Sequence, residues 1–276
     1  MPKNISDLEK TITFEDSDVF VLENQNNTKK AEFGDVYHEM MTRIVPNNAG
    51  AHNSIFRGRN LGTKVSDDQK KAIADGTFKD IFVGDFWKIN GTTYRVAACD
   101  MYLNFGDNAL KKHHLVVVPD YNMYSEQMND SNTTSGGYIG SKMWKTGLDK
   151  AKSTIRKDFG SLLIKHRELL TNSTSGDEPN GWTWVDCEVS LMNERQVFGG
   201  GSWGHRGYNA SYNVGIRHTQ LPLFSLAPNT VQIGYSWYWL SDVASSTFFA
   251  DVSGYGNSTG DNASDSGGVR PFFLIG

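Results

Sequence analysis

The sequence predicts a mixed α+β fold that is built mostly from antiparallel strands, and three observations indicate it. Short runs of alternating apolar and polar residues recur from residue 77 onward, with turn residues between them. Only one stretch, residues 141–163, carries an extended helical stripe of apolar residues. Helices and strands do not alternate regularly along the chain. We therefore expect a mostly antiparallel sheet, one long helix, one or two short helices and long loops.

Length and charge restrict the class of protein. The chain has 276 residues and a formal net charge of −4, which suggests one large domain with a small appendage. It has no basic stripe, so a nucleic-acid partner is not expected. No apolar run approaches the roughly 18 residues of a membrane span, and the first residues lack the apolar core of a signal peptide. We therefore expect no membrane insertion.

Residues 1–50 are predicted to form a separate small unit. Two short strands, at residues 18–23 and 28–33, precede a short helix that begins near Gly34. A hairpin and a short helix bury little apolar surface on their own, so this unit needs the rest of the chain or other copies as a partner. Residues 46–50 mark the boundary with the main domain, residues 51–276. The apolar residues of the helix are Val36, Tyr37, Met40, Met41 and Ile44.

The first half of the main domain contains the clearest local signals. Ser66 or Asp67 can cap a helix that ends at Gly76. Asn90-Gly91 lies between two alternating apolar runs, which is the strongest short-range signal for a hairpin. Residues 113–119 form an apolar run typical of a buried strand, and we expect a polar loop over residues 121–137 to follow it.

The second half is predicted from one helix and several short strands. The helix at residues 141–163 is followed by a loop at 172–181 and by a strand at 182–192. The remaining strands are expected at residues 237–240, 247–252 and 269–275, with loops between them. The apolar stripe of the helix consists of Met143, Trp144, Leu148, Ile155, Phe159, Leu162 and Leu163.

No catalytic or metal-binding motif is found in the sequence. His113 and His114 are adjacent on a predicted strand, so their side chains point to opposite faces and cannot chelate one ion together. Cys99 and Cys187 are far apart in the sequence, which excludes a disulfide framework and a cysteine-rich zinc site, and we expect both to be buried. The sequence predicts a protein that is not an enzyme and has no metal and no cofactor.

Residues 177–180 contain Glu-Pro-Asn, the tripeptide with which animal C-type lectins hold calcium and sugar. The Trp-Asn-Asp segment that completes such a site is missing from this chain. Asp-Glu-Pro-Asn-Gly is also an ordinary turn sequence. Both interpretations remain open at this point.

Residues 203–268 have the composition of a binding surface. Tyrosine and tryptophan offer rigid contact area, and serine, asparagine and glycine offer adaptable hydrogen bonds. We expect Tyr208, Tyr212 and Tyr255 to be exposed, since polar residues surround them. The aromatic residues that we assign to the core are Trp237, Trp239, Phe248 and Phe249.

Three segments resemble known families. Residues 238–250 and 268–275 (the latter Gly-Val-Arg-Pro-Phe-Phe-Leu-Ile) are similar to the C-terminal pattern of a phage and bacterial lectin-like domain family. The Gly-Asp-x-Trp-x-Ile-Asn-Gly run that starts at Gly84 resembles the opening hairpin of that family. Its members share a C-type-lectin-like fold with formylglycine-generating enzymes and with the variable proteins of diversity-generating retroelements. Residues 1–45 resemble the leading segments of phage virion proteins.

The resemblance implies a structure and a binding site. In this fold the two chain ends pair as neighbouring strands, so the C-terminus is buried, and Arg270 needs a carboxylate or carbonyl partner there. Arg270, Trp239 and Trp144 are accordingly expected to be structural. The loops ahead of the last strand carry the ligand-binding positions of the retroelement proteins. Together with the aromatic loop composition, this selects Trp203, Tyr208, Tyr212, Asn213, Tyr235, Tyr255, Asn257, Asp261 and Asn262.

Three functions remain open. The first is a bacteriophage virion protein, made in the host cytoplasm, that binds other virion proteins through residues 1–50, forms a homotrimer and displays a lectin-like domain to a host surface glycan or protein. The second is a structural or decoration protein of capsid or tail, whose loops contact other virion proteins. The third is an enzyme, either a hydrolase or one of the formylglycine-generating type, whose reactive cysteine pair is not matched by Cys99 and Cys187.

Overall fold

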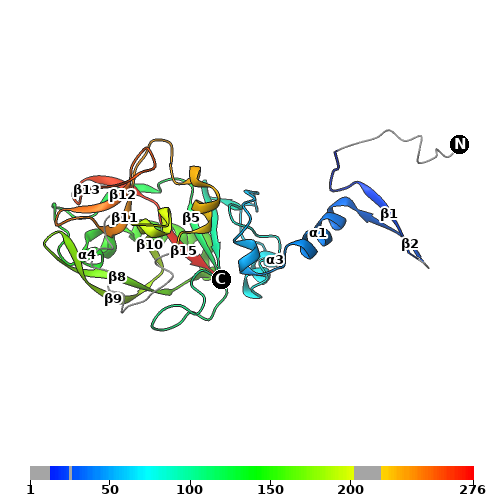
Figure 1. The fold of residues 1–276 in the computed structure, drawn as a ribbon, viewed down its shortest axis with the longest axis horizontal. Helices are drawn as coiled ribbons and strands as arrows, with labels where there is room; N and C mark the ends of the chain where they lie inside the picture. The colour runs from blue at the N-terminus through cyan, green and yellow to red at the C-terminus, as the bar shows by residue number, and fades with distance from the viewer. Residues whose placement is uncertain (1–12, 25–26, 202–218) are drawn as a thin grey trace. The chain divides into compact units, whose positions relative to one another are not determined.

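The computed structural model describes residues 13–24, 27–201 and 219–276 (Figure 1). The chain divides into two compact units, Met1–Asn47 and Asn48–Gly276. The division falls within residues 46–50, where the sequence places the boundary. Among the described residues, the second unit contains all helices and strands that follow the first helix of the chain.

The first unit is a hairpin followed by a helix. Strand β1 (Val19–Asn24) pairs antiparallel with β2 (Asn27–Glu32), and helix α1 (Phe33–Ile44) follows directly. The ring of Phe20 lies 5.9 Å from that of Phe33, so one face of the hairpin packs on the start of the helix. The predicted elements are confirmed. The apolar side chains that stay exposed include Val19, Val21, Tyr37, Met40 and Ile44.

The main sheet of the second unit has six strands, and all of its pairings are antiparallel. Its C-terminal strand lies in the interior of the sheet: β15 pairs on one edge with β5 and on the other with β10 and β7. Figure 1 shows β5 and β15 side by side. In sheet order the strands are β10 (Val189–Leu191), β15 (Pro271–Ile275), β5 (Leu115–Pro119), β4 (Thr92–Cys99) and β3 (Phe86–Ile89). The sixth strand, β7 (Leu163–Ile164), pairs with the last two residues of β15.

A two-residue turn joins β3 to β4. Asn90 and Gly91 have φ values of 48° and 86°, and Ile89 pairs with Thr92 across the turn. Positive φ at both central residues suits the twist of a tight hairpin, and asparagine and glycine adopt it at the lowest cost. The hairpin predicted from Asn-Gly is confirmed, as is the buried strand predicted at residues 113–119.

A second sheet has five strands, and its strand β14 (Ser266–Val269) leads directly into β15 of the first sheet. Only β11 and β14 pair in parallel; the other neighbours are antiparallel. Strand β14 ends at Val269 and β15 begins at Pro271, so the chain passes between the sheets at Arg270. The strands in order are β13 (Ser258–Asn262), β12 (Phe248–Val252), β11 (Tyr238–Val243), β14 (Ser266–Val269) and β6 (Tyr124–Gln127).

The long helix is present but is not uniform. A π-helical turn, η2 (Met143–Gly147), precedes α5 (Asp149–Phe159), and a 3₁₀ turn, η3 (Gly160–Leu162), follows it. At the π turn Leu148 N donates to Met143 O over 2.9 Å. A Cβ at residue 147 would lie 3.1 Å from the Met143 sulfur, so Gly147 allows the wider turn to pack closely.

The second unit has more short helices than the one or two that the sequence predicts, so that expectation is wrong. Ser66 caps α3 in a reciprocal capping box with Gln69, as its sequence pattern predicts. Most of the others have four or five residues, too few for a recognisable period. They are α2 (Ala49–His52), α3 (Asp67–Ala74), α4 (Gly137–Gly140), α6 (Glu194–Phe198) and α7 (Pro222–Leu226), with a 3₁₀ turn, η6 (Pro228–Thr230).

Three segments expected to be loops contain strands. The predicted loop at 172–181 is the distal part of a long hairpin, β8 (His166–Ser175) with β9 (Glu178–Cys187). The predicted loop at 121–137 contains β6, and the polar stretch before the C-terminus contains β13 and the start of β14. These strands are paired through their backbones while their side chains are largely polar, so they lack the apolar alternation used to detect strands.

The C-terminal strand is buried on both faces. Phe272 and Leu274 belong to one hydrophobic cluster, and Phe273 and Ile275 belong to another, as alternation along a strand requires. The predicted burial of the terminus is confirmed. The predicted pairing of the two chain ends is wrong: β15 pairs with β5, β10 and β7, whereas β3, the first strand of this unit, lies at the far edge of the sheet.

Candidate functional site

The structure brings two of the predicted ligand-binding residues together. Tyr235 and Tyr255 are each 79% exposed, and their rings meet edge to face with centroids 6.4 Å apart. Four other predicted positions, Trp203, Tyr208, Tyr212 and Asn213, lie outside the described residues.

Tyr235 is held on a tight turn by an unfavourable backbone conformation. Ser236 N donates to Ile233 O over 3.1 Å, which closes a two-residue turn. The central residues Gly234 and Tyr235 have φ values of 60° and 65°. Left-handed backbone is rare for a bulky residue, and glycine or asparagine is the usual choice there. Such strain is typical of functional positions.

Tyr255 is held by a second turn. Ser253 Oγ accepts hydrogen bonds from Tyr255 N and Asn257 N, both at 3.2 Å. Gly256 N donates to Ser253 O at 2.9 Å, and Gly256 has a φ of 84°. Ser253 thus organises the loop that presents Tyr255, which explains why small polar residues surround the tyrosine in the sequence.

The two turns are locked against each other. Gln232 Nε2 donates to Gly254 O over 2.9 Å. A Cβ at residue 254 would collide with the carbonyl oxygen of Tyr235, so only glycine permits this approach. This hydrogen bond and this close backbone approach fix the two turns relative to each other, and so bring the two exposed rings together.

A small pocket of about 210 Å³ adjoins the first of these turns. Tyr121, which is 69% exposed, lines it from the loop after β5. We call Tyr121, Tyr235 and Tyr255 the tyrosine rim. Sequence analysis missed Tyr121 because it is a single aromatic residue in a polar loop, although its place two residues after a buried strand was a usable signal. The pocket residues are Arg95, Asp120, Tyr121, Thr230, Gln232, Ile233, Gly234 and Arg270.

One wall of the pocket is a bidentate ion pair. Arg95 Nε and Nη2 donate to the two carboxylate oxygens of Asp120, each over 2.6 Å. Arg95 Nη1 also donates to Gly84 O at 2.6 Å, and the guanidinium lies 4.9 Å from the ring centroid of Phe86. This geometry fixes both charged groups, and the Asp120 oxygens remain partly exposed as hydrogen-bond acceptors.

Arg270 holds the loop that carries the rim. Its side chain is 1% exposed, and its Nε donates to Pro119 O over 2.9 Å. Its Nη1 donates to Thr230 O at 3.0 Å, and it lies 3.2 Å from Tyr238 Oη. Arg270 thus forms its hydrogen bonds with backbone carbonyl groups and a tyrosine hydroxyl. Through them the residue ties the end of β5 to the segment that leads into the Tyr235 turn.

The arrangement is suited to recognition of a ligand with polar and apolar faces. Exposed tyrosine rings offer flat apolar area with a hydroxyl at the tip, and the pocket offers carboxylate oxygens and side-chain amide groups. Among the described residues, no group of three or more histidine, cysteine or acidic side chains could hold a metal ion.

Of the three remaining predicted ligand residues, Asn257 belongs to the Tyr255 turn, whereas Asp261 and Asn262 lie in β13. Asn257 is exposed just before this strand, whereas Asp261 and Asn262 are at its other end. Asn257 and Asn262 are five residue steps apart along extended chain, a span of about 17 Å at 3.3–3.4 Å per residue. Partial burial and the nearby Asp265 raise the pKa of Asp261. The structure does not gather Asp261 and Asn262 into the rim.

The two structural tryptophans occupy different environments. Trp239 is fully buried, and its indole N–H donates to Glu126 O over 2.9 Å. Trp144 is half-buried and meets Tyr138 edge to face at 5.5 Å. Phe249 is buried as expected, but Phe248 is 37% exposed, so its assignment to the core is wrong: it faces away from the cluster that holds Phe249.

The cysteines and the Glu-Pro-Asn segment have structural environments. Cys99 and Cys187 are buried, as predicted, and burial raises the pKa of Cys99 well above its usual value. Asp177 lies at the turn between β8 and β9, where its Oδ1 accepts from the N–H and the hydroxyl of Ser246 at 2.9 and 2.6 Å. These hydrogen bonds lower the pKa of Asp177. Glu178, Pro179 and Asn180 follow as the first residues of β9, so only Asp177 of this sequence lies in the turn.

Comparisons with known proteins find no relative. No protein-family model, no curated protein and no solved structure matches the chain. Within the described residues, no helix is long and apolar enough to cross a membrane.

Proposed function

We propose that this chain is a bacteriophage virion protein whose second unit is a C-type-lectin-like display domain, and that the tyrosine rim binds saccharide on the host surface. The observation that carries this proposal is Tyr235, an exposed aromatic residue kept at a φ of 65° beside an equally exposed Tyr255. A recognition surface benefits from both features, because rigid rings lose little entropy on binding.

The fold supports the lectin-like part of the proposal at the level of its class. The second unit is mostly antiparallel, its last strand is buried, and Gly268-Val269-Arg270-Pro271 spans the passage between the two sheets. Long connections ahead of that strand carry the exposed tyrosines, where the resemblance places recognition residues.

The first unit supports attachment and self-association. Tyr37, Met40 and Ile44 of α1 are exposed and are spaced by three and four residues, the interval of a coiled-coil seam. Such a unit gains stability by packing against other copies or other virion proteins. We propose a homotrimer, in which several rims bind one surface and compensate for weak single-site affinity.

Retention of the full-length protein on purified host cell envelopes tests the proposal. The double variant Tyr235→Ala, Tyr255→Ala should lose at least about tenfold in affinity, since aromatic contacts contribute on the order of 1–3 kcal/mol each to a binding site. Phe248→Ala, which removes an exposed aromatic ring outside the rim, is the matched control and should bind like the wild type.

The alternative, a decoration protein without a host ligand, makes a different prediction for the same surface. Its rim would be covered by neighbouring proteins in the particle. Microscopy of the assembled particle with the rim buried, together with wild-type protein that is not retained on envelopes, would replace our proposal with this alternative.

A further inference from the structure

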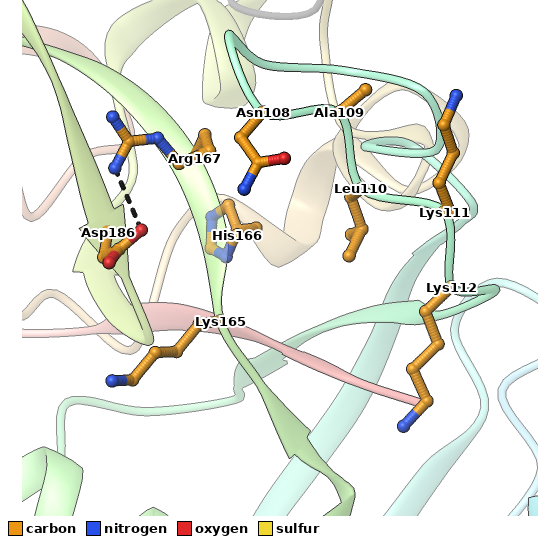
Figure 2. Close-up of a pocket in the computed structure, with 9 residues that line it drawn as sticks. All are labelled: Asn108, Ala109, Leu110, Lys111, Lys112, Lys165, His166, Arg167 and Asp186. Carbon is orange, nitrogen blue, oxygen red and sulfur yellow. Dashed lines mark hydrogen bonds and ion pairs between the residues drawn. The ribbon is translucent and has the colours of Figure 1, made fainter.

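A second and larger pocket lies away from the tyrosine rim. It has a volume of about 590 Å³ and lies between residues 108–112, in the loop that joins β4 to β5, and the start of the β8–β9 hairpin (Figure 2). This volume is within the range of small-molecule sites. Its residues are Asn108, Ala109, Leu110, Lys111, Lys112, Lys165, His166, Arg167 and Asp186, none of which belongs to the rim.

The pocket is strongly cationic in a chain whose net charge is −4. Arg167 is neutralised, because it donates to Asp107 at 2.7 and 2.9 Å and to Asp186 at 2.9 Å. Lys111 donates to Asn104 Oδ1 at 2.8 Å. For Lys112 and Lys165 the structure gives no hydrogen bond or ion pair within its described residues.

Figure 2 shows Lys112 and Lys165 on opposite sides of the pocket, while Arg167 is joined to Asp186. The two lysines come from different segments, the loop before β5 and the residue just before β8. Both side chains are long enough to swing toward a ligand between them. Two uncommitted cations that flank one cavity favour an anionic group there.

His166 supplies a third and independent observation. Its side chain is 1% exposed, and its Nε2 lies 3.1 Å from Glu168 Oε1. A carboxylate can only accept, so Nε2 of His166 is the donor in this contact. Nδ1 is buried without a hydrogen-bond partner among the described residues, which is rare for a polar atom in a folded protein.

We propose that this pocket binds an acidic saccharide. A carboxylate or phosphate on the sugar pairs with Lys112 and Lys165, a sugar hydroxyl forms a hydrogen bond with His166 Nδ1, and Leu110 packs against the apolar edge of the sugar ring. The cations explain the preference for an anion, and the unpartnered imidazole nitrogen explains the preference for a hydroxyl-bearing ligand over a simple ion.

Calorimetric titration of the full chain with four probes tests the proposal. Glucuronate and glucose 6-phosphate carry the two acid groups, glucose is the neutral sugar, and inorganic phosphate is the simple anion. At least one acidic sugar should bind at least tenfold more tightly than glucose and than phosphate. Which of the two acidic sugars binds better identifies the acid group. Equal binding of glucose, equal binding of inorganic phosphate, or no binding of either acidic sugar would overturn the proposal.

Two double variants separate site binding from general charge effects. Lys112→Gln with Lys165→Gln should weaken acidic-sugar binding at least tenfold. Lys79→Gln with Lys157→Gln removes the same charge from exposed positions outside the pocket and should leave binding unchanged. The imidazole resonances of His166 should shift on titration of the wild type. Equal loss of affinity in both double variants would also contradict a specific site.

Discussion

At the scale of single residues, Tyr235 and Asp251 stand out because each occupies a position that a stability-optimised sequence would fill differently. Tyr235 has left-handed backbone on a surface turn, and Asp251 is a fully buried carboxyl group in β12. A left-handed conformation costs a bulky residue roughly 1–2 kcal/mol, which glycine avoids. The retention of tyrosine at that cost is the basis for assigning it a role in recognition.

Tyr235→Gly separates strain from function. We expect the unfolding free energy to be unchanged or to rise by up to about 1 kcal/mol, because relief of strain is partly offset by the entropy of glycine in the unfolded chain. Affinity for host envelopes should fall, because the ring is lost. Urea denaturation and envelope retention measure the two effects. A variant that is clearly destabilised, or that binds as tightly as the wild type, would contradict a strained recognition residue.

Asp251 predicts a pH-dependent stability. Burial raises its pKa from 3.8 to about 7, and one carboxylate oxygen has no partner among the described residues, while Thr259 donates to the other at 2.6 Å. The folded state holds this proton more tightly than the unfolded state does. Its contribution to stability is therefore greatest below about pH 4 and is lost as the pH rises toward 7.

Asp251→Asn should remove that dependence. The variant should be more stable than the wild type above pH 7 by on the order of 2–4 kcal/mol, and the difference should shrink toward zero near pH 4. Denaturation at several pH values measures this, with Asp130→Asn as the exposed control. A constant difference across this pH range would show that the carboxyl group is not the origin of the effect.

At the scale of elements, β15 and its preceding arginine determine how the two sheets are joined. Arg270→Met should destabilise the protein by about 3–5 kcal/mol, because buried carbonyls of Pro119 and Thr230 lose their donor. Arg156→Met removes an exposed arginine from one ion pair and should cost less than about 1 kcal/mol. Similar losses for the two variants in thermal unfolding would rule out this role for Arg270.

The elements predicted correctly from the sequence are those whose own residue types indicate a turn or a buried position. Asn90-Gly91 specifies its own turn, and the apolar runs in β5 and β15 reflect strands buried on both faces. Strands β8 and β13 could not be predicted, because the neighbouring strand that pairs with each backbone cannot be read from its own side-chain pattern. The candidate site was predicted in part: the resemblance pointed to Tyr235 and Tyr255, and loop composition indicated that Tyr255 is exposed. Their contact, and the inclusion of Tyr121, depend on how the loops fold together.

At the scale of the whole molecule, the account predicts an assembly. Sedimentation of the full chain should give a trimer. Tyr37→Ser with Ile44→Ser should give a monomer, because both substitutions place polar groups on the exposed apolar stripe of α1. Glu39→Ser with Arg43→Ser changes an exposed ion pair on the same helix and should leave the trimer intact. A wild-type chain that sediments as a monomer would remove the basis for multivalent binding.

The central claim is that the fold presents the tyrosine rim for saccharide recognition, and it is tested most directly by nuclear magnetic resonance. The ring resonances of all tyrosines are followed while purified host-envelope polysaccharide is added to the full chain. The account predicts that Tyr121, Tyr235 and Tyr255 shift together, while the fully buried Tyr94 and Tyr238 do not. Rim resonances that stay unchanged at saturating polysaccharide would contradict the claim.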